Sequence, residues 1–429
     1  MKYKNIFLCF NIVVLVFFIT TKNINSQTEN FEDLDINEAL ALALENNPEI
    51  KAFSSNIEAK DGLVIQAGLY PNSEINVEIE NFAGSGAAQG FDEAVTTVLI
   101  SQLVPIYGKI GKKEKVSRIV KNIAELEYES KRLDVVLSTK NSFIDVLSKQ
   151  ERLEQIEQLV KIAEQVNMTI SERVEAGKES PIEEKKSSIE FEQTNLLLTK
   201  AGRDLASSRK LLSANWGDVE VTFGKILGDL YSTAKISGFE ELQNSISNNP
   251  DIIISLRDQD LNSANIKLQN ALGVPDPTFG IGYRRLSETE DNALVAEFSM
   301  PLPFFNRNQG NIKEASFNLV KSRQEYQNLY TRTSAELAEK YENLKFYIDE
   351  IETLEDKILP QSEDTYETIL EGYREGKFEF LDVLDSQRTL FNSKLQYIDA
   401  LRNYHSLAFE IERLTGAEFP KINPGGDDT

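Results

Sequence analysis

Few side chains in this sequence could carry covalent or metal chemistry. Its 429 residues include one Cys, Cys9, and one His, His405. These counts exclude a thiol enzyme, a disulfide scaffold and a Cys/His zinc site. His405 stands in a predicted helix among Tyr404, Leu407 and Phe409, so we expect it to pack rather than to bind a ligand. The three Met residues do not cluster as a soft-metal site requires, so we expect no resident metal and no cofactor.

The remaining side chains that could have a chemical role are carboxylates. Asp382 and Asp385 follow a turn and are three residues apart, so they share one face of the helix predicted there. A ring of such side chains around an axis attracts cations and repels anions. Acidic residues at a helix start also complement the helix dipole, which is the simpler role for this pair. The other carboxylates fall on solvated helix faces, so we expect no enzyme.

Composition limits the class of protein further. The chain has 46 Lys and Arg against 69 Asp and Glu, a formal charge of −23. This balance excludes the basic footprint of a nucleic-acid-binding protein. With 41% hydrophobic and 27% charged residues, the chain is neither disordered by composition nor a bundle of membrane helices.

The first 26 residues have the pattern of a secretory signal peptide. Lys2 and Lys4 precede an apolar run over residues 6–19, and polar residues follow up to Ser26. A membrane anchor is the alternative, but the run is shorter than a bilayer span. Cys9 lies inside the run, so we expect no lipid attachment there. After residue 26 no stretch is long and apolar enough for a membrane helix, which leaves an exported soluble protein or a β-barrel.

The sequence repeats itself after roughly 200 residues. Asn-Asn-Pro, an acidic residue and Ile occur at residues 46–50 and again at 248–252. Residues 175–184 likewise align with 374–383. We therefore predict a signal peptide at 1–26, repeats at 27–217 and 239–416, a linker at 218–238 and a tail at 417–429.

Each repeat predicts a medium helix, two strands and two long helices. The medium helices cover residues 36–69 and 239–273. Alternating apolar residues predict the four strands, at 73–82, 93–104, 278–285 and 293–300. The same alternation also fits ordinary half-buried hairpins on a soluble domain.

The long helices follow from apolar residues at three- and four-residue steps. We expect one from about 111 to 176 and its counterpart from about 310 to 373, with a kink at Pro360. Gly177 and Gly376 end them, and Ser180 with Glu183 predicts a capping box for the next helix. Such helices pack as coiled coils.

Four strands cannot close a barrel, and open sheet edges do not occur in lipid. If these strands enter a membrane, several chains must share one barrel. Three chains would supply twelve strands, enough for an open lumen.

Several segments resemble the trimeric outer-membrane efflux proteins typified by TolC. The resemblance covers residues 34–416 and includes EALALALENNPEIKA (38–52), AGLYPN (67–72) and the two tip turns. The segment SMPLPFFNRNQGNIKEA (299–315) is most similar to the heavy-metal-efflux branch related to CzcC and CusC. The chain departs from those branch members that carry a lipid on an N-terminal Cys.

The resemblance implies a homotrimer in the outer membrane, with a twelve-stranded barrel and an α-helical tunnel in the periplasm. It implies a passive exit duct that a periplasmic adaptor and an inner-membrane pump, of the resistance-nodulation-division type, recruit. The cargo would be metal cations or small molecules. The alternatives are a periplasmic coiled-coil adaptor and the exit channel of a protein secretion system.

The resemblance also implies roles for residues near the tips. Asp382 and Asp385 match positions that line the narrowest part of the closed tunnel; Glu183 aligns with Asp382, and Lys186 with Asp385. Tyr373 matches a position that helps to hold the tip closed. Phe378 stands where an arginine partner of that Tyr is usual.

Two further sets of residues stand at changes of direction. The tip turns are expected to contact the adaptor through Arg173, Gly177, Lys178, Arg374, Gly376 and Lys377. Ordinary solvated turns are the alternative. The passage from barrel strands to tunnel helices is expected at Pro105, Pro301 and Pro303, because proline ends a strand ladder. Simple strand stops are the alternative there.

Overall fold

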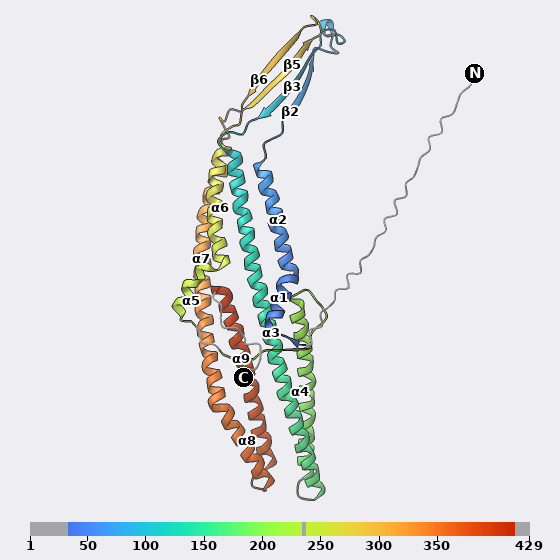
Figure 1. Ribbon diagram of the computed structural model, residues 1–429, viewed down its shortest axis with the longest axis vertical. Coiled ribbons are helices and arrows are strands. Elements are labelled where there is room, and N and C mark those ends of the chain that lie inside the picture. The colour runs from blue at the N-terminus through green and yellow to red at the C-terminus, as the bar shows by residue number, and fades with distance from the viewer. Residues whose placement is uncertain (1–32, 234–236, 417–429) are drawn as a thin grey trace, which may run out of the picture.

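The computed structural model describes residues 33–233 and 237–416, which form one long, narrow molecule (Figure 1). A small sheet lies at one end, and two turns between long helices lie at the other. The predicted signal peptide, with Cys9, and the predicted tail lie outside the described residues. None of the described helices combines the length and the apolar character that crossing a bilayer requires.

The described chain is mainly helical and runs through the predicted order of elements twice. The first half contains β1 (Asp33–Leu34), α1 (Ile36–Asn46), α2 (Pro48–Gly68), β2 (Glu74–Glu80), a 3₁₀ turn (Gly86–Ala88), β3 (Val95–Leu103), α3 (Lys109–Glu175) and α4 (Pro181–Ala214). The second contains β4 (Lys225–Ile226), α5 (Phe239–Ser245), a 3₁₀ turn (Ile246–Asn248), α6 (Pro250–Leu272), β5 (Thr278–Leu286), β6 (Asn292–Ser299), α7 (Gln309–Thr353), α8 (Leu359–Arg374) and α9 (Phe380–Thr415).

Four of these strands form one antiparallel sheet in the order β2-β3-β5-β6. They lie within two residues of the predicted limits. The central pairing, β3 with β5, joins the two halves of the chain. Strands β2 and β6 form the edges, and neither has a second strand partner within residues 33–233 and 237–416. The short parallel pair of β1 and β4 was not predicted.

One face of the four-stranded sheet is apolar from edge to edge. Cross-strand neighbours such as Ile75, Ile100 and Ile281 share this face, as side-chain alternation requires. Ile281 is 67% exposed and Leu294 is 84% exposed. The described elements therefore leave the apolar face uncovered, and a half-buried hairpin does not describe it.

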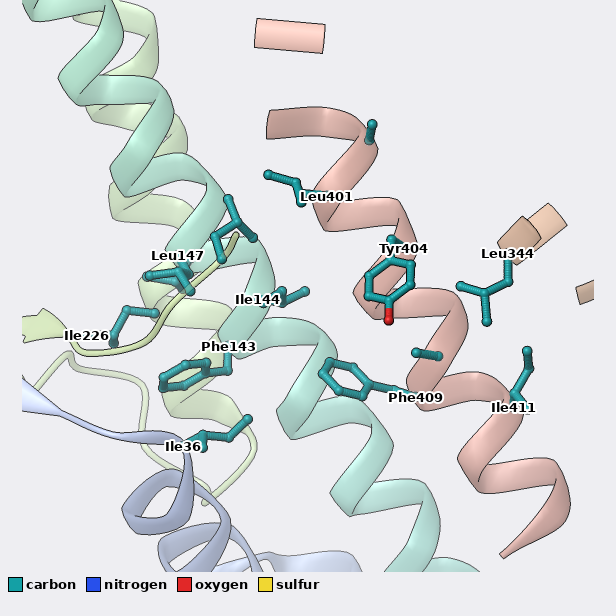
Figure 2. Close-up of a cluster of buried hydrophobic side chains, with 14 of the residues drawn as sticks. Ile36, Phe143, Ile144, Leu147, Ile226, Leu344, Leu401, Tyr404, Phe409 and Ile411 are labelled. Carbon is teal, nitrogen blue, oxygen red and sulfur yellow. The ribbon is translucent and has the colours of Figure 1, made fainter. Parts of the chain in front are cut away.

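The main core lies halfway along the molecule, where helices of both halves meet (Figure 2). Phe143 and Ile144 of α3 belong to one buried cluster with Leu401 and Ile411 of α9. Ile226 of β4 joins the same cluster, so the linker packs into the core. Helices α3 and α4 form one helical hairpin, and α7 and α8 form the other with α9. Burial of these side chains holds the two hairpins together halfway along the molecule.

The helix is irregular just before Pro360, where a kink was predicted. The chain forms a π turn, Leu354–Ile358, between α7 and α8. Proline has no N–H and its ring clashes with the carbonyl four residues earlier. The wider turn removes that contact without ending the helix. The predicted helix over 310–373 is therefore three consecutive segments.

The repeated Asn-Pro motif ties the start of each half to its end. The Asn47 Oδ1 accepts the Glu49 N–H at 2.8 Å, and its Nδ2 donates to the carbonyl of Asn215 at 2.7 Å. The Asn249 Oδ1 accepts the Asp251 N–H at 2.8 Å, and its Nδ2 donates to the carbonyl of Leu414 at 2.9 Å. Each Asn thus caps one helix and satisfies the end of another.

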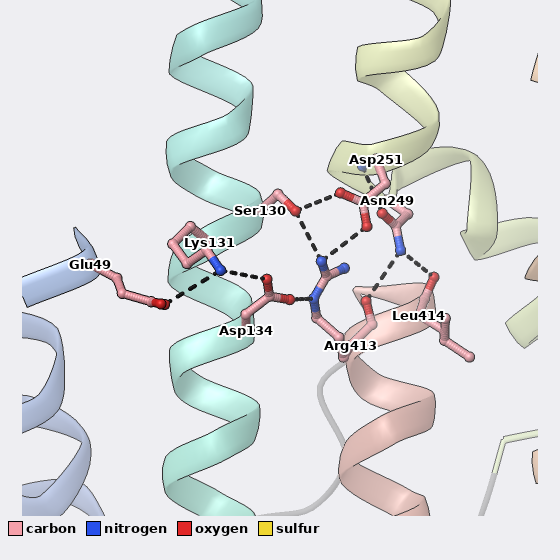
Figure 3. Close-up of polar contacts among 8 residues, drawn as sticks. All are labelled: Glu49, Ser130, Lys131, Asp134, Asn249, Asp251, Arg413 and Leu414. Carbon is pink, nitrogen blue, oxygen red and sulfur yellow. Dashed lines mark hydrogen bonds and ion pairs between the residues drawn. The ribbon is translucent and has the colours of Figure 1, made fainter. Parts of the chain in front are cut away.

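An ion network surrounds the contact of Asn249 with Leu414 (Figure 3). The Arg413 guanidinium lies 2.8 Å from Asp134 Oδ1 and 2.9 Å from Asp251 Oδ2. Burial alone lowers the pKa of Arg413, but the two carboxylates raise it and set the net direction. Arg413 therefore stays positively charged, and its two ion pairs join α9 to α3 and α6.

We predict that Asn47→Ser lowers stability although Ser can still cap a helix. The substitution removes the Nδ2 donor and leaves the buried carbonyl of Asn215 unpaired, which costs about 1–3 kcal/mol. Thermal unfolding of the purified protein should show a lower midpoint. Asn46→Ser is the control, because no hydrogen bond of the Asn46 side chain is seen in the described structure. Equal midpoints for the two variants would contradict this role of Asn47.

Candidate functional site

The two predicted tip turns lie at the same end of the molecule, opposite the sheet (Figure 1). Gly177 has φ +68° and Gly376 has φ +79°, a backbone region in which side chains are strained. The Lys178 N–H donates to the carbonyl of Arg173 at 2.8 Å, and the Lys377 N–H donates to that of Gly372 at 2.8 Å. Both turns are therefore Schellman motifs, and the two Gly residues end the helices as predicted.

The helix starts after the turns differ from the prediction. The capping box predicted at Ser180 and Glu183 is wrong: Ser180 Oγ accepts the Ile182 N–H at 3.2 Å, while Glu183 pairs with Lys186 at 2.9 Å. A capping box forms at the second turn, where the Glu379 N–H donates to Asp382 Oδ2 at 2.9 Å. Glu379 replaces the usual Ser or Thr, which hid the motif.

Arg173 and Tyr373 bring the two hairpins into contact. The Arg173 Cζ lies 5.0 Å from the centroid of the Tyr373 ring, a distance at which the cation attracts the aromatic face. The Arg173 Nε also lies 3.3 Å from Glu179 Oε2. Arg173 was predicted at an adaptor surface, and the structure places its head group between the hairpins. Sequence offered no signal for this pair, whose members stand in different halves of the chain.

Tyr373 is only 7% exposed and belongs to a second buried cluster, with Ile170 of α3 and Phe380 and Val383 of α9. Burial raises the pKa of Tyr373, and the positive charge of Arg173 opposes that change. Within the described residues its hydroxyl has no hydrogen-bond partner. A buried donor without a partner is costly, so the aromatic face rather than the hydroxyl holds the contact.

Phe378 packs against Gly372 in the place where the resembled family has an arginine. A Cβ at position 372 would lie 2.5 Å from Phe378 Cδ2, so the ring takes the space that a side chain would need. An apolar contact, Phe378 against Gly372, therefore fills the tip of the second hairpin.

Asp382 and Asp385 are both exposed and line one groove between α8 and α9. The groove has a volume of about 500 Å³ and also contains Ser386, Thr389 and Phe378. The chain thus presents two carboxylates on one surface, as their spacing predicts. Glu183 does not line this groove; its charge instead raises the pKa of Tyr373 as a minor contribution after burial.

A larger groove of about 650 Å³ lies between α3, α4 and α9. Arg388 of α9 pairs with Glu190 of α4 across it. Nearer the core, Arg402 Nε lies 2.9 Å from Asp145 Oδ1 of α3. These ion pairs join the two hairpins above the tips, and sequence reasoning missed them because they depend on how the hairpins pack.

The other predicted contact residues occupy the surfaces that their turns suggest. Arg374, Lys178 and Lys377 are exposed around the turns, and Lys377 pairs with Glu375. Pro105 follows β3, whereas Pro301 and Pro303 follow β6, so all three lie between the sheet and the long helices.

The structure also places His405. It is buried, its Nε2 lies 2.9 Å from the carbonyl of Leu230, and the rings of Tyr404 and Phe409 lie beside it. Burial lowers its pKa. His405 therefore packs against the linker, as its neighbours in the sequence predict. Among residues 33–233 and 237–416 no three His, Cys, Asp or Glu side chains gather as a metal site.

Known proteins share the sequence pattern of this chain. The pattern of the family described as outer membrane efflux protein matches residues 39–218 and 242–417. The cobalt-zinc-cadmium resistance protein CzcC of Cupriavidus metallidurans is 29% identical over 383 residues, which cover 89% of this chain and 90% of that protein.

Solved structures share its fold. A membrane protein from Pseudomonas aeruginosa superimposes with a TM-score of 0.77 at 15% identity, covering 89% of this chain and 92% of that one. Crystal structures of CusC give a TM-score of 0.73 at 16% identity, covering 90% of this chain and 93% of that one. At such identities the likeness concerns the fold alone.

We predict that Arg173→Ala loosens the contact between the hairpins at their tips. A cation–aromatic contact of this kind contributes about 0.5–2 kcal/mol, so backbone amides of residues 366–374 should exchange hydrogen about 2- to 30-fold faster. Hydrogen exchange followed by mass spectrometry measures this. Lys178→Ala is the control, because Lys178 is exposed on the same turn and forms no ion pair within the described residues. Equal exchange in both variants would refute the contact.

Proposed function

The chain belongs to the outer membrane efflux protein family, and on that basis we propose that three copies form a passive exit channel through the outer membrane. The observation that carries the proposal is the sheet: an exposed apolar face, two unpaired edges, and a direct connection to helices that extend away from it. Such a sheet is stable in lipid only when other strands close it.

Three sheets supply twelve strands, enough for a barrel with an open lumen. The apolar face then meets lipid. The opposite face carries Glu74 and Glu78 on β2 and Glu297 on β6, which face water in the lumen. Arg284 lies among them and donates from its Nε to Thr97 Oγ1 at 3.0 Å. The two faces therefore suit the two solvents of a membrane pore.

The long helices continue the lumen as a tunnel. Helix α3 has 67 residues, which corresponds to about 100 Å at 1.5 Å per residue. We place these helices in the periplasm, and residues 1–26 are the proposed export signal. No step in this transport requires catalysis by the chain: energy and selection come from an inner-membrane pump, of the resistance-nodulation-division type, joined through a periplasmic adaptor.

The tip turns are the proposed contact surface for the adaptor. Gly177 and Gly376 are exposed, and a Cβ at either position would meet nothing within 4 Å. The exposed bases Lys178, Arg374 and Lys377 surround them. These turns are therefore open to a partner on the side away from the membrane, whereas Arg173 is occupied by the contact with Tyr373.

The narrowest part of the tunnel is proposed at Asp382 and Asp385. Threefold symmetry brings six carboxylates around one axis, which attracts cations and repels anions. The capping role of Asp382 is compatible with this, since its side chain stays exposed. The contact of Arg173 with Tyr373 then holds the hairpins in the closed arrangement, and Glu183 contributes negative charge beside it.

Metal cations are the proposed cargo, with small molecules as the second candidate. The relative CzcC is named for resistance to cobalt, zinc and cadmium, which supports the first. A duct for cations needs no ligand cluster of its own, because tight binding would slow release. The acidic groove between α8 and α9 suits the passage of cations.

We predict that Asp382→Asn with Asp385→Asn weakens the cation selectivity of the channel. The purified wild type should form pores in planar bilayers with a reversal potential that favours potassium over chloride, and divalent cations should block them. The double variant should shift the reversal potential towards zero and weaken the block about tenfold or more, since it removes six charges from one ring.

Asp364→Asn with Glu367→Gln is the matched control, because both residues are exposed on α8 and lie outside the groove. This control should keep wild-type selectivity. If the Asp382 and Asp385 variant kept wild-type selectivity, the proposal that these residues form the constriction would be wrong. If the wild type formed no pores, the proposal that the chain forms a channel would be wrong.

A further inference from the structure

The strongest departure from the acidic character of the chain lies where the sheet passes into the helices. The formal charge of the whole chain is −23, yet residues 109–121 contain six basic residues and one acidic residue, Glu114. Several of these bases fall in the first turns of α3. Bases near a helix N-terminus oppose the helix dipole, so their position needs another reason.

Some of the bases have structural roles. Lys109 Nζ lies 2.7 Å from Asp276 Oδ1, and Lys121 Nζ lies 2.6 Å from Asp61 Oδ1. Lys112 donates to the carbonyl of Tyr107 and lies over its ring. These contacts account for half of the group but for none of its most exposed members.

A fourth member, Arg118, pairs with Glu114. Two bases of the group remain, and two from another segment lie near the same level; none of these four exposed bases forms an ion pair within residues 33–233 and 237–416. Two are on α3 and two lie at the start of α7: Lys113, Lys115, Arg307 and Lys313. Contacts hold both helix starts at one level, since the Ile106 N–H donates to Asp276 Oδ1 at 2.9 Å and the Asn308 Nδ2 donates to the carbonyl of Gln269 at 2.7 Å.

Exposed apolar side chains lie at the same level. Phe304 is 73% exposed and Phe305 is 92% exposed in the segment between β6 and α7. The exposed rings of Tyr70 and Tyr107 lie in the other connections of the sheet to the helices. We call these four aromatic residues and the four unpaired bases the junction collar.

The collar continues the apolar face of the sheet. Phe279 and Phe298 pair across β5 and β6 with ring centroids 5.4 Å apart, one residue before the last pairing of these strands. Next come the aromatic residues of the collar, and then its bases. Apolar face, aromatic belt and positive charge therefore succeed one another along the molecule, which is the order that a membrane surface selects.

We propose that the junction collar binds the phosphate groups of anionic phospholipids in the leaflet that borders the helices. The inference rests on the proposed function, which puts the sheet in the membrane. Lys113 lies four residues into α3, about 6 Å along its axis. The headgroup layer is about 5–7 Å deep, so flexible basic side chains at this level reach its phosphates.

Charge complementarity selects the lipid. A zwitterionic headgroup offers no net charge, whereas each base near an anionic membrane surface contributes about a fivefold gain in affinity. The collar therefore prefers anionic over zwitterionic lipid, and Phe304 and Phe305 enter the edge of the acyl region. This contact fixes the depth of the channel in the bilayer.

The test uses the full trimer, reconstituted in vesicles of phosphatidylethanolamine and phosphatidylglycerol and then analysed for retained lipid by native mass spectrometry. Wild type should retain phosphatidylglycerol in preference to phosphatidylethanolamine. Lys113→Glu with Lys115→Glu and Arg307→Glu should lower this preference at least about tenfold while the trimers stay intact. Lys51→Glu with Arg203→Glu and Lys210→Glu makes the same charge change at exposed residues away from the collar and should keep it.

Equal retention of the two lipids by wild type, or an unchanged preference in the collar variant, would overturn the inference. Displacement of phosphatidylglycerol by an equal concentration of inorganic phosphate would also overturn it, because the site would then bind free anions. Failure of wild type to enter the vesicles at all would overturn the proposed function, and this outcome is distinct from insertion without lipid preference.

Discussion

A four-stranded sheet with an uncovered apolar face and two unpaired edges is not stable alone in water. Exposed edges recruit other strands, and apolar surface of this extent marks an interface with lipid or protein. Since β3 pairs with β5, the sheet is also the place where the two halves of the chain are joined at one end. Closure by further copies and burial in lipid satisfy both requirements at once.

The rest of the chain connects the sheet to the tip turns at the other end of the molecule. Asn47 and Asn249 tie α2 and α6 to the ends of α4 and α9, and the mid-height core holds the two hairpins side by side. Below the core, a second and smaller apolar cluster joins the hairpins. An ion pair, Arg388 with Glu190, and the contact of Arg173 with Tyr373 lie beside it. The larger apolar core thus lies at the middle of the molecule and the smaller one near its tips.

Local patterns in the sequence predicted much of this fold. Apolar periodicity gave the order of elements, alternation gave the strands, and Gly177 and Gly376 marked the tip turns because backbone conformation there requires glycine. Contacts between distant segments were out of reach. The Arg173 and Tyr373 pair depends on how the two hairpins pack, which no short motif encodes. The capping box at Glu379 is local but lacks the usual Ser or Thr, and the π turn lies just before Pro360, where only a kink was predicted. The spacing of Asp382 and Asp385 predicted their shared surface, but not that Glu183 would lie away from it.

Disulfide cross-linking can detect whether the sheets of different chains pair edge to edge. The sequence after residue 26 contains no Cys, so Val77→Cys on β2 can be combined in turn with Leu294→Cys, Ala296→Cys or Phe298→Cys on β6. We expect that one of these combinations, the one in register, gives a covalent trimer on oxidation, because facing strand residues lie within disulfide reach. Only monomers in all three combinations would contradict a barrel shared by three chains.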